Sequence, residues 1–204
     1  IYSPANGKNV LAVGSTYNAD GYRDVRASFS CQGPTSDNRI KPDLLAPGVA
    51  IDSAASSGSE ARTCRVVAKT GTSMSTPIVA ASALLLSQYL EQGYYPSGTP
   101  RAEDAFVPAA STLKALLVHS GQPTREESAL FGAEETELAF PGNKQGFGRM
   151  DLNAVLYWRN ESAFNLFIQE GEMDDHVRRV SFSLLVSISS LLCLAPFTPT
   201  HSLK

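Results

Sequence analysis

The sequence predicts an α/β fold with a mostly parallel sheet. Three features support this prediction: the apolar run "NVLAVGS" at 9–15, the paired apolar runs of "DLLAPGVAIDSA" at 43–54, and a stretch at 73–93 that is apolar nearly all round between Ile78 and Leu86. Strands buried on both faces of a parallel sheet form short continuous apolar runs. A helix that is apolar on all sides is buried within its protein.

The first half of the chain is expected to contain short strands separated by polar loops. The run at 9–15 is the first strand, and a polar segment rich in turn formers follows it over 16–43. Pro47 and Gly48 divide the next run into two strands, because proline lacks a donor and glycine bends freely. The string "CRVVAKTG" at 64–71 has β-branched residues and a terminal glycine, so it is a further strand candidate.

The stretch "SMSTPIVAASALLLSQYLEQG" is expected to form a buried central helix. Pro77 is expected in its first turn, where the amide hydrogens have no intrahelical partner and a proline is tolerated. Gly93 is a suitable C-terminal stop.

Two shorter helices are expected after a proline-rich loop at 94–110. "STLKALLVHSG" places Leu113, Leu116 and Leu117 on one face, and either Ser111 or Thr112 is expected to cap it. "QGFGRMDLNAVL" predicts a glycine-rich turn and then a short helix with Asp151 as N-cap.

Composition excludes several classes of function. The chain has 204 residues, of which 43% are hydrophobic and 18% charged, as in soluble globular proteins. Its net charge of −3 gives no electrostatic basis for binding nucleic acid or an anionic membrane. The chain begins at Ile1 without a charged-then-apolar leader, and we interpret this as a start partway into a domain.

The three cysteines, Cys31, Cys64 and Cys193, are too few for a disulfide scaffold and show no C-x-x-C spacing. A bridge between Cys31 and Cys64 and buried free thiols are the two alternatives. The sequon at 160–162 is consistent with secretion.

The C-terminal segment 180–204 has no charged residue before Lys204. Its apolar part, 182–195, is shorter than the roughly 20 apolar residues of a membrane span. A buried strand or hairpin is the favoured interpretation. The alternatives are a membrane anchor and a segment that is not native coding sequence.

The string "GTSMSTP" at 71–77 has the arrangement that a nucleophilic serine needs. Ser73 in the first turn of a buried helix is held at a fixed point, close to free amides that can stabilise an oxyanion. Gly71 before it permits close approach of a substrate carbonyl. The alternative is that Thr72 or Ser73 merely caps the helix.

The whole string "GTSMSTPIVA" closely resembles the nucleophile motif of the subtilisin-like serine proteases, G-T-S-M-A-x-P-x-V-A. Four further strings resemble other parts of that family: "PANGKNVLAVGS", "SFSCQGPTSDNRIKPDLLAPGVAI", "LKALLVHSG" and "QGFGRMDLNAVL". Ser75, Ile78 and Ala81 depart from the residues usual in the motif, and none of them is the reacting group. The resemblance covers about residues 1–157.

The resemblance implies a partial subtilisin-like three-layer fold that lacks its N-terminal strands. Residues 1–157 would be the C-terminal part of a subtilase catalytic domain. Residues 158–204 would be the start of a possible β-sandwich domain that runs into an atypical apolar tail.

The resemblance also implies that Ser73 is the nucleophile of a serine-type endopeptidase, which forms an acyl-enzyme that water hydrolyses. The backbone amide of Ser73 would donate one hydrogen bond to the oxyanion. In subtilisin the catalytic residues follow the chain order Asp, His, Ser, so the partners of Ser73 should lie upstream of it.

No histidine stands among the 72 residues before Ser73. The chain's histidines, His119, His176 and His201, all follow it, and His119 is expected to be structural. Four upstream aspartates lie in expected loops or strand edges: Asp20, Asp24, Asp37 and Asp43.

The family's oxyanion asparagine lies in an A-G-N string that is absent, so Asn6 is expected to be a turn residue. We therefore expect a fragment without the Asp and His of the triad, inactive by itself and poorly soluble. The alternative is a catalytically inactive binding or scaffold module derived from a subtilase.

The resemblance further indicates the partners and location. The chemistry requires no cofactor, although structural calcium occurs in many family members. Asp43 is a candidate ligand for it, with a turn or strand-end role as the alternative. We expect protein or peptide substrates and an extracellular or secretory location. We expect neither nucleic acid nor a membrane as a partner.

Overall fold

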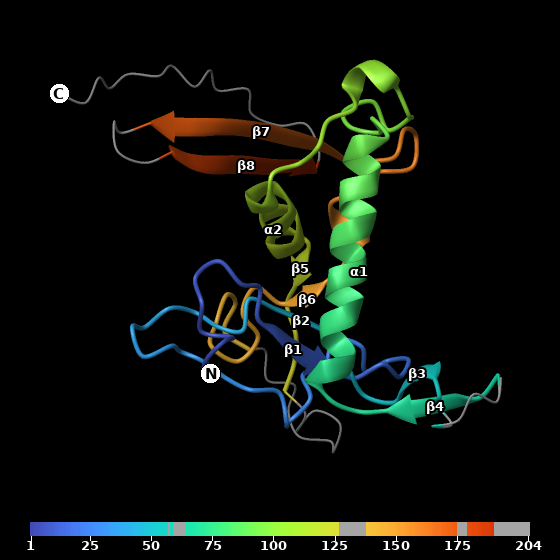
Figure 1. The fold of residues 1–204 in the computed structure, drawn as a ribbon, viewed down its shortest axis with the longest axis vertical. Coiled ribbons are helices and arrows are strands. Elements are labelled where there is room, and N and C mark those ends of the chain that lie inside the picture. Colours follow the sequence, from blue (N-terminus) through green and yellow to red (C-terminus); the bar gives the residue numbers. More distant parts are fainter. Residues whose placement is uncertain (57, 59–63, 127–137, 175–178, 190–204) are drawn as a thin grey trace.

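The computed structural model describes residues 1–204 except 57, 59–63, 127–137, 175–178 and 190–204. Its central sheet has the strand order β1-β2-β6-β5 (Figure 1). The strands are β1 (Val13–Thr16), β2 (Leu44–Pro47), β6 (Arg149–Met150) and β5 (Gly121–Gln122). β1 and β6 both pair with β2 in parallel, and β5 pairs with β6 antiparallel. The mixed α/β class and the mostly parallel sheet are therefore confirmed.

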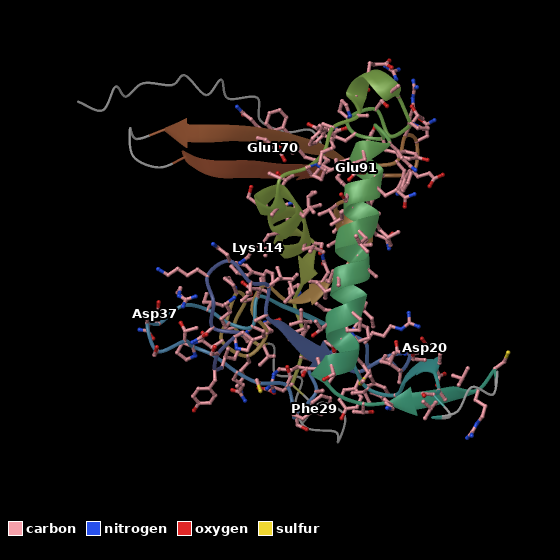
Figure 2. All side chains as sticks on the ribbon, in the orientation of Figure 1. Asp20, Phe29, Asp37, Glu91, Lys114 and Glu170 are labelled. Carbon is pink, nitrogen blue, oxygen red and sulfur yellow. The ribbon has the colours of Figure 1, made fainter. Side chains whose placement is uncertain are left out.

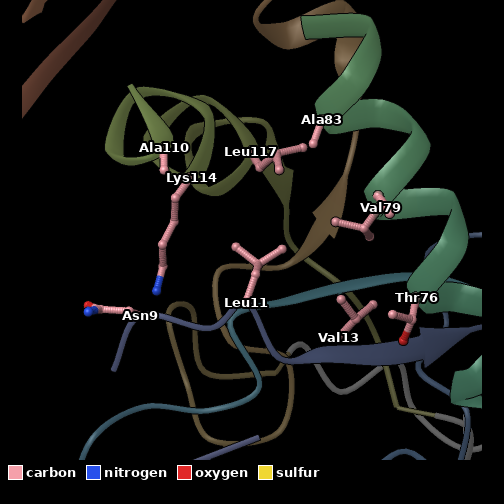
Figure 3. Close-up of a pocket in the computed structure, with 10 residues that line it drawn as sticks. Asn9, Leu11, Val13, Thr76, Val79, Ala83, Ala110, Lys114 and Leu117 are labelled. Carbon is pink, nitrogen blue, oxygen red and sulfur yellow. The ribbon is translucent and has the colours of Figure 1, made fainter. Parts of the chain in front are cut away.

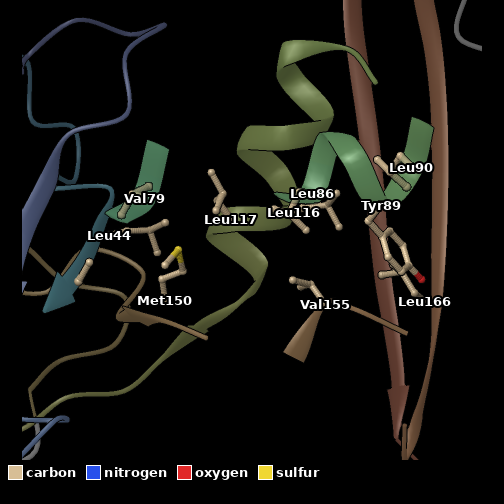
Figure 4. Close-up of a cluster of buried hydrophobic side chains, with 11 residues drawn as sticks. Leu44, Val79, Leu86, Tyr89, Leu90, Leu116, Leu117, Met150, Val155 and Leu166 are labelled. Atoms are coloured by element: carbon tan, nitrogen blue, oxygen red, sulfur yellow. The ribbon is translucent and has the colours of Figure 1, made fainter. Parts of the chain in front are cut away.

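Two helices pack together beside this sheet, α1 (Thr72–Glu91) and α2 (Ala110–His119). α1 contacts β1, β2 and α2. The apolar side chains between them form one core cluster (Figure 4), whose largest members are Leu44, Val79, Leu86, Tyr89, Leu90, Leu116, Leu117, Met150, Val155 and Leu166. Of the three leucines expected on one face of α2, Leu116 and Leu117 are in this core, and Leu113 is partly buried against it.

The prediction that the first helix is buried on all sides is wrong. Its inner side is buried, but Pro77, Ala80 and Ala81 on the opposite side are exposed. Leu84 and Leu85 continue this surface, and they are 72% and 53% exposed. Within the described part of the chain, the sheet and α2 cover only one side of α1. We refer to these five residues as the apolar stripe.

Pro77 is the sixth residue of α1, not a first-turn residue as predicted. At this position a proline lacks the amide that would bond to the carbonyl four residues earlier. The carbonyl of Ser73 is thus left without its usual intrahelical donor.

The second helix is not capped by its own hydroxyl residues. It begins at Ala110, so Ser111 and Thr112 lie inside it. The cap comes from β7 (Phe164–Asp174): the amide of Ala109 donates to Glu170 Oε1 at 2.9 Å, and Thr112 Oγ1 bonds the same oxygen. Figure 2 shows Glu170 beside the start of α2. The expectation that Ser111 or Thr112 caps the helix is therefore wrong.

Two hairpins stand apart from the central sheet. Strands β3 (Ile51–Ala54) and β4 (Val66–Lys69) pair antiparallel, which confirms the strand break at Pro47 and Gly48. Strand β7 pairs antiparallel with β8 (Arg179–Ser189).

The β7–β8 pair confirms a hairpin for the start of the apolar tail, while 190–204 lie outside the described residues. The division into domains at residue 157 stays a prediction. No helix in the described part of the chain combines the length and apolarity needed to cross a membrane.

Two short 3-10 helices complete the described elements, at Ala102–Asp104 and Leu152–Ala154. Asp151 is the N-cap of the second one, as predicted, and accepts a hydrogen bond from the Asn153 amide at 3.0 Å.

The cysteines differ from both expectations. Cys31 and Cys64 are free and exposed, so the predicted bridge is not formed and the buried-thiol interpretation is wrong for both. Cys193 lies outside the described residues.

Candidate active site

Ser73 is the second residue of α1 and is exposed. The chain reaches it from β4 through a turn at Gly71, whose φ is 151° and ψ is 161°. Residues that carry a side chain rarely adopt such a backbone conformation, and glycine does so without strain. A Cβ added at Gly71 would make only ordinary van der Waals contacts. Glycine is therefore required here by the backbone conformation and not by a lack of space.

The turn is fastened to the junction between β2 and β3. The Gly71 amide donates to the carbonyl of Gly48 at 2.8 Å, and the Met74 amide donates to the carbonyl of Gly71 at 2.9 Å. The serine therefore has a fixed position relative to the sheet as well as to the helix.

Gly48 is required by close packing. A Cβ on it would lie 2.3 Å from Ser15 Oγ and 2.3 Å from Ser75 Oγ, and 2.8 Å from the Gly71 carbonyl oxygen. Ser15 and Ser75 are both fully buried, so neither hydroxyl can move into solvent. Any larger residue at 48 would push the turn that bears Ser73 away from the sheet.

Ser75 differs from most buried polar residues in the hydrogen bonding of its hydroxyl. Its Oγ is buried and has no hydrogen-bond partner among the described residues. Buried hydroxyls without partners are costly. Alanine, the usual residue of the resembled motif at this position, would avoid that cost.

The start of α1 has the electrostatics of an anion-stabilising site. No side chain caps the helix, since its N-cap is Gly71, and its first turn holds no acidic residue. The first amides of a helix lack intrahelical partners and carry the positive end of the helix dipole. An oxyanion formed beside Ser73 would therefore meet free donors and favourable charge.

Four upstream aspartates are ion-paired and therefore do not face Ser73 as free carboxylates. The pairs are Asp20 with Arg23 at 2.8 Å, Asp24 with Arg125 at 2.7 Å, Asp37 with Arg39 at 2.9 Å, and Asp43 with Lys41. The hydrogen bond from Arg125 lowers the pKa of Asp24, and that from Arg39 holds the pKa of Asp37 well below its ordinary value. Of these four pairs, that of Asp24 with Arg125 joins segments distant in sequence, and the other three are local.

Asp43 is the most heavily engaged of these carboxylates. Its Oδ2 accepts from the Ala12 amide at 2.6 Å and from Lys41, and its Oδ1 lies 3.4 Å from Lys114 Nζ. Lys41 Nζ also donates to the Val10 carbonyl at 3.0 Å. This supports the strand-end role for Asp43 over the calcium role.

Across the described residues, no three His, Cys, Asp or Glu side chains cluster as metal ligands. Structural calcium stays a prediction from the resemblance.

The structure does not bring a base to Ser73 within the described residues. His119 is the exposed last residue of α2, and its side chain forms no hydrogen bond or ion pair with another described residue. His176 and His201 lie outside the described residues. Asn6 sits in a turn, as predicted, where its carbonyl accepts a bond from Arg39 at 2.8 Å.

An apolar recess of about 270 Å³ opens one helical turn beyond Ser73 (Figure 3). Thr76, Val79, Ala80 and Ala83 of α1 form one wall of it. The opposite walls are the segment that leads into β1 and the inner face of α2, with Leu11, Val13, Ala110, Lys114 and Leu117. Because its edge includes Ala80, the recess is continuous with the apolar stripe.

Sequence reasoning missed two residues that shape the site. From the sequence, Gly48 is predicted only as a strand break, and no pattern points to Glu170. The adjacent Pro47 and Gly48 could indicate a sharp bend, but no local signal shows which side chains approach a glycine across the sheet.

Comparisons with known proteins agree with this geometry. The model of the Subtilase family matches residues 1–149. The serine protease/ABC transporter B family protein tagD of Dictyostelium discoideum is 41% identical over 151 residues, 64% of this chain and 8% of that protein. The serine protease AprX of Bacillus subtilis is 40% identical over 99 residues, 43% of this chain and 22% of AprX.

A solved structure supports the same fold. The CspB protease of Clostridium perfringens superposes with a TM-score of 0.50 and 26% identity over 75% of this chain and 27% of that one. The chain thus spans 8% of the length of tagD and about a quarter of CspB. With a family model that matches most of its length and a protease as structural neighbour, the chain belongs to the subtilase family.

Proposed function

We propose that this chain provides the nucleophile-bearing part of a serine-type endopeptidase, with Ser73 as nucleophile. The observation that carries the proposal is the position of Ser73, exposed at the uncapped start of α1 on a glycine turn fastened to the sheet. Membership of the subtilase family supports a peptidase at the level of the family.

In this mechanism Ser73 Oγ attacks the carbonyl carbon of a peptide bond while a base accepts its proton. The Ser73 amide donates to the oxyanion that forms, and the amine leaves with a proton from the base. Water, deprotonated by the same base, then hydrolyses the acyl-enzyme and restores the Ser73 hydroxyl.

The base and its orienting carboxylate would come from polypeptide outside the described residues. Two observations support this: the apolar stripe on α1 and the apolar recess beside it both lie on surfaces that further chain could cover. Exposed apolar patches of this kind mark interaction surfaces. By this proposal, residues 1–157 act only in combination with that polypeptide.

The substrates would be proteins or peptides, and the location extracellular or in the secretory pathway. The sequon asparagine, Asn160, is exposed, which is compatible with glycosylation there. A catalytically inactive scaffold is the second candidate, and the absence of a base beside Ser73 in the described residues favours it.

A serine-directed fluorophosphonate probe tests the proposal on the full-length gene product. We expect labelling of the wild type and of Ser75→Ala, whose hydroxyl is buried, and loss of labelling in Ser73→Ala. Labelling that persists in Ser73→Ala, or wild-type protein that takes no label, would contradict the proposal and favour the scaffold.

A further inference from the structure

The β3–β4 hairpin carries an exposed basic strand directly before the Ser73 turn. Residues 64–70 are all exposed, and β4 ends four residues before Ser73. Figure 1 shows the hairpin projecting from the base of α1, away from the β7–β8 pair. Nothing else in the described chain pairs with β4.

The outer edge of β4 offers free backbone groups. The Ala55 amide donates to the Arg65 carbonyl at 2.9 Å, so this pair of residues is hydrogen-bonded. Bonded and non-bonded pairs alternate along an antiparallel ladder, which directs the amides and carbonyls of Val66 and Ala68 away from β3. Such an edge can accept another extended segment as an added strand.

Two cations lie on one face of β4 and the residue directly before it, Arg65, which continues the pairing through its bond to Ala55. Arg65 and Lys69 are four residues apart, and side chains at even separations share a face of a strand. At a rise of about 3.3 Å per residue, their Cα atoms are about 13 Å apart. Neither forms an ion pair with another described residue.

We propose that β4 binds an extended segment of substrate as an added strand, and that Arg65 and Lys69 select acidic side chains four residues apart in it. The proposal deepens the proposed function, on which it rests for calling that segment a substrate. Because β4 runs into the turn at Gly71, a segment bound along it is led toward Ser73. The chemical class is therefore an extended acidic peptide.

Fluorescence anisotropy with the 204-residue chain tests the spacing. Two labelled peptides of about ten Thr, Ser and Val residues each carry two glutamates, spaced either four or three residues apart. With spacing three, the glutamates fall on opposite faces of a strand. Each exposed charge pair contributes little to the free energy of binding, so a modest difference is expected. The spacing-four peptide should bind at least about threefold more tightly than the spacing-three peptide.

Charge reversal tests the residues. The double variant Arg65→Glu/Lys69→Glu should lose this preference and bind the lysine version of the peptide instead. Arg101→Glu/Arg159→Glu is the matched control, because it makes the same change of charge at two other exposed arginines.

The proposal is overturned if the wild-type chain binds neither peptide measurably or binds the two with equal affinity. It is also overturned if the control variant Arg101→Glu/Arg159→Glu loses the preference for the spacing-four peptide to the same extent as the double variant at Arg65 and Lys69. The readout does not depend on Ser73. Binding without probe labelling would therefore refute the proposed function alone, and labelling without binding would refute this inference alone.

Discussion

At the scale of single residues, the position of Ser73 depends on how closely two backbone segments approach. Gly71 provides a backbone conformation that other residues rarely adopt, and Gly48 leaves room for the buried hydroxyls of Ser15 and Ser75. The two glycines are joined by a hydrogen bond of 2.8 Å. Their roles differ, so substitutions at the two positions should act through different physical causes.

We predict that Gly48→Ala destabilises the fold by about 1–3 kcal/mol, because its Cβ would overlap buried atoms. Urea denaturation monitored by circular dichroism measures the free energy of unfolding. Adding Ser75→Ala should recover part of the loss, since it removes one of the atoms that the new Cβ meets. Full stability of Gly48→Ala would show that the turn can move away from the sheet without cost.

At the scale of elements, α2 depends on a residue that belongs to a different element. Glu170 of β7 accepts hydrogen bonds from Ala109 and Thr112, across 61 and 58 residues of chain. A carboxylate at a helix N-terminus accepts hydrogen bonds from the free amides and interacts favourably with the positive end of the helix dipole. The hairpin and α2 therefore stabilise each other.

We predict that Glu170→Ala costs about 0.5–2 kcal/mol of stability, the range found when helix caps are removed. Thermal denaturation compares it with Glu161→Ala, which truncates an exposed glutamate at the start of the same region. Equal midpoints for the two variants would mean that Glu170 does not act as a cap.

The helix and strand signals were local, and so the sequence predicted them well. The apolar runs predicted β1, β2, β4, α1 and α2, and the resemblance of residues 71–80 to a family motif is the basis for proposing Ser73 as nucleophile. The cap of α2 could not be predicted, because Glu170 is remote in sequence and Ser111 and Thr112 offered an equally good local alternative. The exposed side of α1 could not be predicted, because an all-apolar pattern indicates burial but does not show which segment of chain covers each side of the helix.

At the scale of the whole molecule, we expect the apolar stripe to affect how the chain behaves in solution. Leu84 is 72% exposed and Leu85 is 53% exposed, on a helix whose other side lies in the core. Soluble monomers seldom leave a contiguous apolar surface of this kind uncovered. Self-association of the 204-residue chain is the expected result.

We predict that Leu84→Ser/Leu85→Ser reduces aggregation of the 204-residue chain with little change in its thermal midpoint. Light scattering during heating and at rising protein concentration measures the effect. Leu86→Ser is the control, because Leu86 is fully buried and its loss should cost about 2–5 kcal/mol. Unchanged scattering in the double variant would show that another surface causes association.

Pro77 has a consequence for the order of folding. With no amide at this residue, the Ser73 carbonyl lacks its usual intrahelical donor, so the first turn of α1 is held by one local hydrogen bond fewer than an ordinary helix start. The bond from Gly71 to Gly48 spans 23 residues and forms only when helix and sheet have met. Because such non-local contacts require loop closure first, the serine turn should acquire its final geometry late, after the core behind it has assembled.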